Sequence, residues 1–166
     1  MAQGFASNSF NQLTRKVPPG YRVVTGSITE FPEWFLTANK FVILSQLYRS
    51  SIVNFSSTYG LVSSNPNIYG GSHKHAAYGV SKAGVINLTQ YLATHLAPNV
   101  RINCVVPGGV LFKQSKKFRD SYSKLAPMKR MMHKHELNEV IEFLCSDNSS
   151  YTTGSVLVID GGYTIW

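Results

Sequence analysis

Short apolar runs alternate with longer amphipathic segments from residue 51 onward. Residues 51–56, 100–106 and 155–159 are rich in β-branched or other apolar residues and have the length of buried strands. Residues 76–96 and 136–145 carry apolar side chains at helical spacing. Strands that alternate with helices are typical of a parallel sheet with right-handed crossovers. The pattern therefore predicts an α/β fold, with helices covering both faces of the sheet.

The first 50 residues lack this regularity. Pro18-Pro19-Gly20 and Phe31-Pro32 interrupt the segment, and only residues 34–48 have apolar spacing compatible with a helix. We therefore divide the chain into a shortened, irregular segment, 1–50, and a regular α/β unit, 51–166.

Composition narrows the class of protein. The 166 residues are 43% hydrophobic, which is typical of a globular domain and excludes a disordered or collagen-like chain. No apolar run approaches the roughly 18 residues that a membrane span needs, and the first ten residues do not resemble a secretory signal. Cys104 and Cys145 lie in apolar runs without metal-ligand spacing. We expect buried thiols, no metal site and a cytoplasmic location.

Positive charge is concentrated in one segment. The chain has 16 Lys and Arg against 8 Asp and Glu, a net charge of +8. Half of the basic residues lie in 113–134, with Asp120 as the one acid there: Lys113, Lys116, Lys117, Arg119, Lys124, Lys129, Arg130 and Lys134. The segment could cover an anionic substrate, bind nucleic acid or form a solvated helix face. No aromatic ladder accompanies it, which makes nucleic acid the weakest of the three.

Tyr78 and Lys82 are the first residues that could carry chemistry. Residues four apart share one face of a helix, so the Lys82 ammonium can lie near the Tyr78 phenol. A neighbouring cation lowers the pKa of a tyrosine below its usual ~10 and makes it a proton donor and acceptor near neutral pH. The helix follows a strand that ends at Ser57, and Pro107-Gly108 ends the next strand. Sites of parallel sheets form at such carboxyl ends.

With these residues assembled, the chain resembles the short-chain dehydrogenase/reductase family over residues 51–166. The matching segments follow one another at compatible spacing: Ile52–Ser57, Tyr78-x-x-x-Lys82, Arg101–Gly109, Phe143–Asp147, Ser150–Gly154 and Val158–Gly162. The resemblance implies an incomplete doubly wound, Rossmann-like parallel sheet. It also implies an oxidoreductase that interconverts a carbonyl and a hydroxyl on a small metabolite.

The resemblance also assigns roles to individual residues. It implies that Ser57 holds the substrate oxygen and that Tyr78 exchanges the proton. Lys82 would lower the pKa of the tyrosine and bind the nicotinamide ribose. Asn39 corresponds to the family's fourth catalytic residue, although its interval to the strand at 51–57 is shorter than usual.

The implied cofactor is NAD or NADP. Tyr78 and Lys82, with Pro107, Gly108 and Val110, would contact its nicotinamide half. The family's glycine-rich turn, which presents N–H groups to the pyrophosphate, has no counterpart here. We therefore expect weak cofactor binding by this chain alone. A truncated, catalytically silent fragment or assembly partner is the alternative to an active enzyme, and a basic nucleic-acid-binding module is the third.

Two further features bear on substrate and assembly. Ser57 precedes Tyr78 by 21 residues, and the extra segment 59–75 resembles a subgroup from bacterial surface-sugar and nonulosonate pathways. The resemblance therefore favours a sugar-like or anionic substrate. The family often forms oligomers through the helix at 76–96 and the last strand with its tail. The apolar tail 163–166 accordingly predicts a homo-oligomer.

Overall fold

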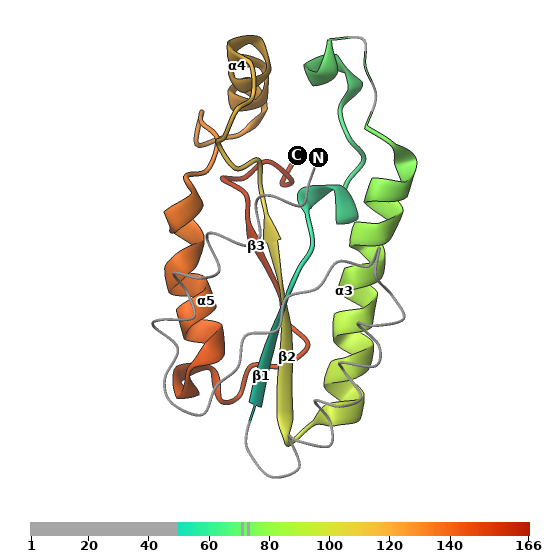
Figure 1. Ribbon diagram of the computed structural model, residues 1–166, viewed down its shortest axis with the longest axis vertical. Coiled ribbons are helices and arrows are strands. Elements are labelled where there is room, and N and C mark those ends of the chain that lie inside the picture. Colours follow the sequence, from blue (N-terminus) through green and yellow to red (C-terminus); the bar gives the residue numbers. More distant parts are fainter. Residues whose placement is uncertain (1–49, 71, 73) are drawn as a thin grey trace.

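The computed structural model describes residues 50–70, 72 and 74–166 as a parallel sheet flanked by helices (Figure 1). Strands β1 (Ser50–Phe55), β2 (Val100–Pro107) and β3 (Val156–Ile159) lie in the order β1-β2-β3, and both pairings are parallel. The three predicted strands are confirmed. Residues 1–49 lie outside the described residues, together with the predicted helix at 34–48 and Asn39.

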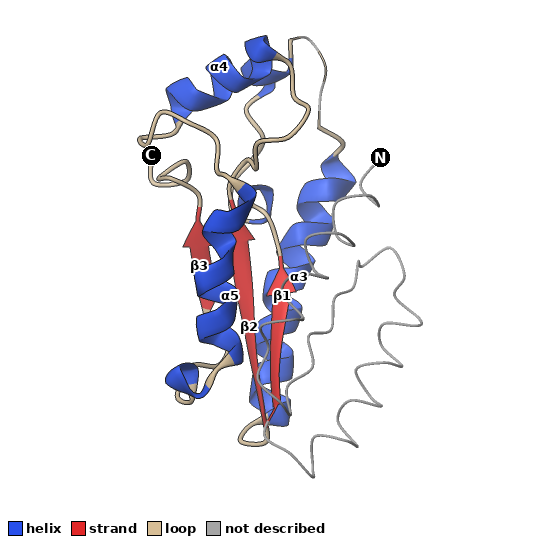
Figure 2. Cartoon of the chain, turned by 60° about the vertical axis from the view of Figure 1, so that its left-hand side comes forward, coloured by secondary structure: helices blue, strands red, loops and turns tan. Residues whose placement is uncertain are grey.

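Helices cover both faces of the sheet. Helix α3 (Ala76–Leu96) lies on one side and α5 (Asn138–Cys145) on the other, whereas α4 (Lys116–Leu125) lies beyond the carboxyl ends of the strands (Figures 1 and 2). The α3 bounds agree with the sequence prediction. Helix α5 starts two residues later than predicted, because Lys134–Leu137 form a tighter 3-10 turn. The Glu136 side chain folds back there and accepts the His133 N–H at 2.7 Å.

Neighbouring residues of β1 enter two different cores. Ile52 packs with Ala93 of α3 on one face, whereas Val53 packs with Leu144 of α5 on the other, because side chains alternate along a strand. Cys104 and Cys145 are both buried, as predicted, and burial raises the pKa of each thiol. Burial on both faces explains why β1 and β2 read as continuous apolar runs, whereas β3 is only partly buried.

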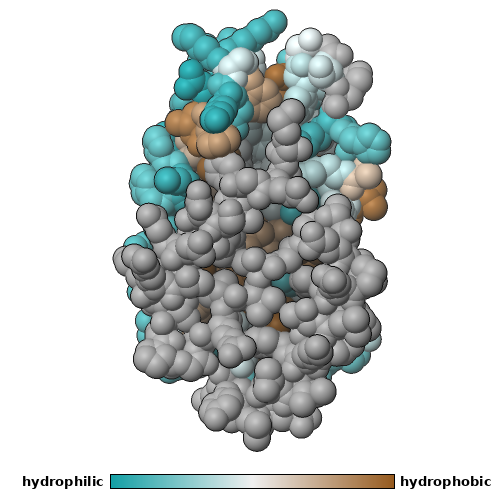
Figure 3. Space-filling view, viewed as in Figure 1, coloured by the Kyte–Doolittle hydropathy of each residue, from teal (hydrophilic) through white to brown (hydrophobic). Residues whose placement is uncertain are grey.

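The basic segment forms an amphipathic cap. The Ser115 side chain accepts the Phe118 N–H and starts α4, whose Tyr122 is buried. Figure 3 shows hydrophilic side chains gathered over this helix. Asp120 pairs with Lys116 at 2.7 Å on the exposed side. The predicted short helix in this segment is confirmed, and none of the described helices has the length and apolar character of a membrane span.

Arg101 joins the end of α5 to the sheet. Its guanidinium donates to the carbonyl oxygens of Leu144 at 3.1 Å and Ser146 at 3.0 Å, and to Ser149 Oγ at 2.8 Å. Ser51 Oγ donates to the same Leu144 carbonyl at 2.7 Å. Carbonyl groups at a helix end have no partner within the helix, and Arg101 supplies charged donors to two of them.

We expect Arg101→Met to lower the free energy of unfolding by about 2 kcal/mol, because hydrogen bonds from a charged donor contribute more than neutral ones. Urea unfolding followed by circular dichroism measures the change. Arg119→Met, on the exposed side of α4, is the matched control and should shift the midpoint little. Equal effects of the two substitutions would contradict the role given to Arg101.

Candidate active site

A cleft of about 630 Å³ opens at the carboxyl ends of β1 and β2. Its walls are formed by residues from the turn after β1, the segment 59–75, the start of α3, the turn after β2 and α4. Its volume falls in the range typical of small-molecule sites. The cleft brings together five residues that the sequence singled out, namely Ser57, Tyr78, Pro107, Gly108 and Val110.

The turn after β1 packs closely against α3. Buried Ser56 donates through Oγ to the Lys82 carbonyl at 2.7 Å. A Cβ on Gly60 would lie 2.8 Å from the Lys82 carbonyl carbon, so only glycine allows this approach. The Lys82 ammonium in turn donates to the Phe55 carbonyl at 3.2 Å. Lys82 is therefore fixed at its backbone and at its charged end by the same strand and turn.

Ser57 has a structural contact as well as a place in the cleft. Its Oγ accepts the Tyr59 N–H at 3.3 Å and caps the short 3-10 turn Thr58–Gly60. In this bond the Ser57 oxygen is the acceptor, so the hydroxyl proton remains available to donate to another group. Ser57 can therefore cap the turn and donate into the cleft at once.

Tyr78 lies in the first turn of α3. His75 caps the helix by accepting the Ala77 N–H at 3.2 Å. The Tyr78 ring meets the Tyr59 ring edge to face, with centroids 6.4 Å apart. Two ammonium groups lie near this ring, with Lys82 Nζ 5.8 Å and Lys74 Nζ 4.4 Å from its centroid. Two positive charges thus lie close to the Tyr78 ring.

The turn after β2 forms the facing wall. Gly108 N–H donates to the Ile159 carbonyl at 2.9 Å, which continues the pairing with β3 past the end of the strand. A Cβ on Gly108 would come within 2.8 Å of the Asp160 Cα. A side chain there would push the turn away from the strand and into the cleft.

Tyr122, which also lines the cleft, supports this turn, and the sequence did not predict this contact. Its Oη accepts the Gly109 N–H at 2.6 Å, and its ring stacks on Tyr163 with centroids 4.7 Å apart and planes 8° apart. Burial raises the pKa of Tyr122 to about 12, so the phenol stays protonated. The two tyrosines are 41 residues apart, and no local spacing signals their contact.

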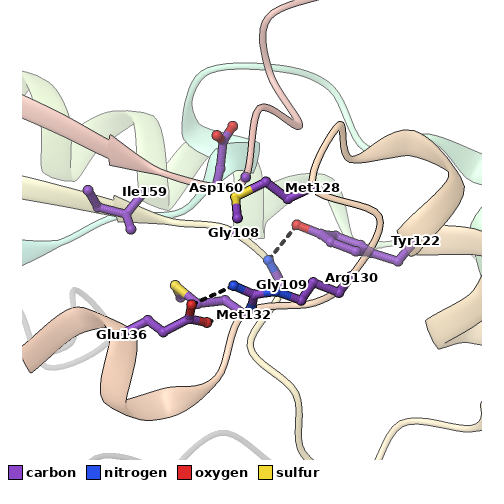
Figure 4. A pocket seen from close by; sticks show the side chains of 10 residues that line it. Gly108, Gly109, Tyr122, Met128, Arg130, Met132, Glu136, Ile159 and Asp160 are labelled. Atoms are coloured by element: carbon purple, nitrogen blue, oxygen red, sulfur yellow. Dashed lines mark hydrogen bonds and ion pairs between the residues drawn. The ribbon is translucent and has the colours of Figure 1, made fainter.

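A small second cavity of about 70 Å³ lies behind the same turn (Figure 4). Arg130 and Glu136 form an ion pair on its wall, with Nη2 and Oε1 2.6 Å apart. The Arg130 guanidinium, helped by the His133 N–H, lowers the pKa of Glu136 to about 2. The cavity is well below the size of a substrate site, and we read it as packing space beneath the turn.

The segment 59–75 closes the cleft against α4. The Tyr69 hydroxyl donates to the Tyr59 hydroxyl at 2.6 Å, and the Tyr69 ring meets Phe118 with centroids 5.6 Å apart. Burial raises the pKa of both Tyr59 and Tyr69. A continuous series of aromatic contacts thus runs from Tyr78 through this segment to α4.

The carboxyl-terminal tail packs partly on its own chain. Asp160 accepts the N–H groups of Gly162 and Thr164, both at 2.8 Å, and so fixes the turn that buries Tyr163. The sequence predicted an interface for the whole tail. Tyr163 does not fit this prediction, because its buried ring stacks on Tyr122 of the same chain. Ile165 and Trp166 remain about three-quarters exposed.

The chain is similar in sequence to known reductases and dehydrogenases. Residues 35–164 match a sequence family described as enoyl-(acyl carrier protein) reductase. The chain is 42% identical over 120 residues to the 3-oxoacyl-(acyl-carrier-protein) reductase of Thermotoga maritima, covering 69% of this chain and 46% of the relative. It is 35% identical over 127 residues to the ribulose-forming D-arabinitol 2-dehydrogenase of Scheffersomyces stipitis, covering 71% of this chain and 44% of the relative. The chain thus spans about half the length of these curated relatives.

A solved structure agrees with these relatives. The short-chain dehydrogenase from Leptospira borgpetersenii, crystallised with bound NAD+, superposes with a TM-score of 0.77 at 30% identity. The match covers 94% of this chain and 68% of that one.

Tyr122→Phe tests the support of the turn. The substitution keeps the ring and its stack but leaves the Gly109 N–H without its acceptor, which should lower the free energy of unfolding by about 1–2 kcal/mol. Hydrogen exchange followed by NMR should show faster exchange of the Gly109 amide. Tyr151→Phe, at a fully exposed tyrosine, is the matched control. Unchanged protection of Gly109 would refute the assignment.

Proposed function

Because the chain belongs to the short-chain dehydrogenase/reductase family, we propose that it carries the catalytic groups of an NAD(P)-dependent oxidoreductase. The reaction interconverts a carbonyl and a hydroxyl group on a small metabolite. The observation that carries this proposal is the convergence of Ser57, Tyr78 and the Pro107–Val110 turn on one cleft, with the Lys82 ammonium 5.8 Å from the centroid of the Tyr78 ring.

Each of three side chains has a part in the chemistry. Ser57 donates its hydroxyl proton to the substrate oxygen and holds it beside Tyr78. In the reducing direction, Tyr78 Oη gives its proton to the carbonyl oxygen as the hydride reaches the carbonyl carbon, which produces the alcohol. The Lys82 ammonium stabilises the negative charge that then develops on the Tyr78 oxygen. Asn39 keeps its proposed role as a fourth catalytic residue and lies outside the described residues.

The cleft fits the nicotinamide half of the cofactor. Pro107, Gly108 and Val110 give a wall of backbone and apolar atoms against which a flat ring can lie, and Tyr78 and Lys82 offer donors for ribose hydroxyls. When bound, the nicotinamide supplies or accepts the hydride. The 166 residues contain no Gly-x-Gly-x-x-Gly segment for the pyrophosphate, so we propose weak binding of NAD(H) or NADP(H) by this chain alone.

We further propose a polar, sugar-like substrate. The walls of the cleft carry several hydroxyl groups and the Gln114 amide among aromatic rings, a combination suited to a hydroxylated skeleton. The D-arabinitol dehydrogenase among the relatives is named for a polyol, which is consistent with this proposal. Membership of the surface-sugar and nonulosonate subgroup rests on the length of segment 59–75 and stays a prediction.

A second copy of this chain is the proposed partner. Helix α3 exposes a face without charged side chains, on which Val80 is 72% and Tyr91 57% exposed. The two residues lie eleven positions apart, about three helical turns, so they share one stripe with Ala83 and Asn87. An uncharged stripe of this length suits packing against the same helix of another protomer.

Tyr78→Phe tests the proposed reaction. With millimolar NADH or NADPH and a panel of polyol and ketose substrates, we expect turnover to fall at least a hundredfold, because proton transfer typically contributes about 10²–10⁴ in rate. Nicotinamide binding, followed by fluorescence, should change little. Tyr151→Phe, at a fully exposed tyrosine outside both the cleft and the proposed α3 interface, is the control. Retention of more than a tenth of the activity by the Tyr78 variant would exclude its role in proton transfer.

Ala83→Arg tests the proposed pairing of α3. Placing a charge in the middle of the uncharged stripe should convert the oligomer to monomer in analytical ultracentrifugation. Glu139→Arg, exposed on α5, introduces the same side chain elsewhere and should leave the oligomer intact. A monomeric parent chain at tens of micromolar would rule out this interface.

A further inference from the structure

We propose that the cleft takes a small hydroxy acid and that the Lys74 ammonium binds its carboxylate. The inference rests on the proposed function only for the reacting carbon, which would lie beside Ser57 and Tyr78. The binding of the anion itself depends on the charge and geometry of the cleft.

Among the residues that the structure describes, the side chains that line the cleft carry positive charge and no negative charge. Lys74 is the cationic residue among them, and no Asp or Glu is included. The Lys82 ammonium is not part of the lining but lies 5.8 Å from the centroid of the Tyr78 ring and donates to the Phe55 carbonyl. The potential inside a cleft with low-dielectric walls is therefore positive, and it favours an anion over a neutral or cationic ligand.

Lys74 has a defined place in the cleft. Its Nζ lies over the Tyr78 ring, 4.4 Å from the centroid, and the ring face attracts the ammonium. Among the described residues no carboxylate pairs with this ammonium, in contrast to Lys116, which pairs with Asp120. Its donors can therefore reach a ligand that also contacts Tyr78.

The number and type of donors favour a carboxylate over a phosphate. A single flexible ammonium matches one negative charge, whereas phosphate sites usually combine several donors or a forked guanidinium. None of the described residues that line the cleft is an arginine. Because the ammonium lies next to the Tyr78 ring, the carboxylate would lie within a few bonds of the carbon that reacts.

Binding of D-gluconate and D-gluconamide separates charge from shape, since the two probes have the same carbon chain and hydroxyls. NMR of the full chain with labelled tyrosines follows the Tyr78 ring resonances during each titration. We expect gluconate to bind about fivefold more tightly than gluconamide, a size suited to an exposed ammonium. Lys74→Met should abolish that preference, and Lys74→Arg should largely keep it. Raising the salt concentration should weaken gluconate alone.

Lys113→Met is the matched control, because Lys113 lies outside the cleft lining and contacts the Phe112 ring. The inference is overturned if gluconate does not perturb Tyr78 at 50 mM, if Lys113→Met weakens gluconate as much as Lys74→Met, or if Lys74→Met weakens both probes equally. The last result would mean that Lys74 positions Tyr78 and does not bind the anion.

Selective gluconate binding without turnover would contradict the proposed reaction and leave this site intact. If the chain instead turns over neutral substrates in a reaction that requires Tyr78, but does not prefer gluconate, the proposed reaction would stand and this site would be excluded.

Discussion

The close contact between the turn after β1 and the second turn of α3 determines how the site is built. Ser56 reaches the Lys82 carbonyl at 2.7 Å, and Gly60 approaches the same peptide group so closely that no side chain fits. The turn and the helix therefore cannot move independently. Since Ser57 lies in the turn and Tyr78 one helical turn before Lys82, a single packing contact sets the relative position of all three groups.

The facing wall depends on longer-range packing. Strand β2 is central in the sheet, and its last residues continue into the Pro107–Val110 turn. That turn is fixed from two sides, by the Ile159 carbonyl at Gly108 and by the Tyr122 hydroxyl at Gly109. Because Tyr122 stacks on Tyr163, the order of the carboxyl-terminal tail and the shape of the cleft are coupled. A tail that is remote in sequence thus contributes to a wall of the site.

Helix α4 and the cleft beneath it carry positive charge in different settings. Helix α4 presents lysines to solvent, with Lys116 paired to Asp120, and turns Phe118 and Tyr122 inward. The exposed lysines contribute a weak, screened field, whereas Lys74 lies at the cleft itself. Of the three interpretations of the basic segment, the exposed lysines of α4 and the Lys116–Asp120 pair agree best with a solvated helix face.

The sequence by itself determined the order and type of the elements from residue 50 onward. Strands buried on both faces gave continuous apolar runs, and α3 was predicted from Ala76 to Leu96 because its periodicity is local. The four-residue spacing of Tyr78 and Lys82 and their place after a strand end also follow from local rules.

Only the tertiary structure decided which distant side chains meet. The Tyr122–Tyr163 stack depends on how separate elements pack. Lys74 precedes Tyr78 by only four residues, so its place over the ring is local, whereas the cleft that both residues line is formed by other elements. The Ser57 cap on Tyr59 is local, but whether the hydroxyl also faces a cleft depends on the wall opposite. Periodicity reports which face of an element is buried, whereas the partner across that face is set by the packing of the whole sheet.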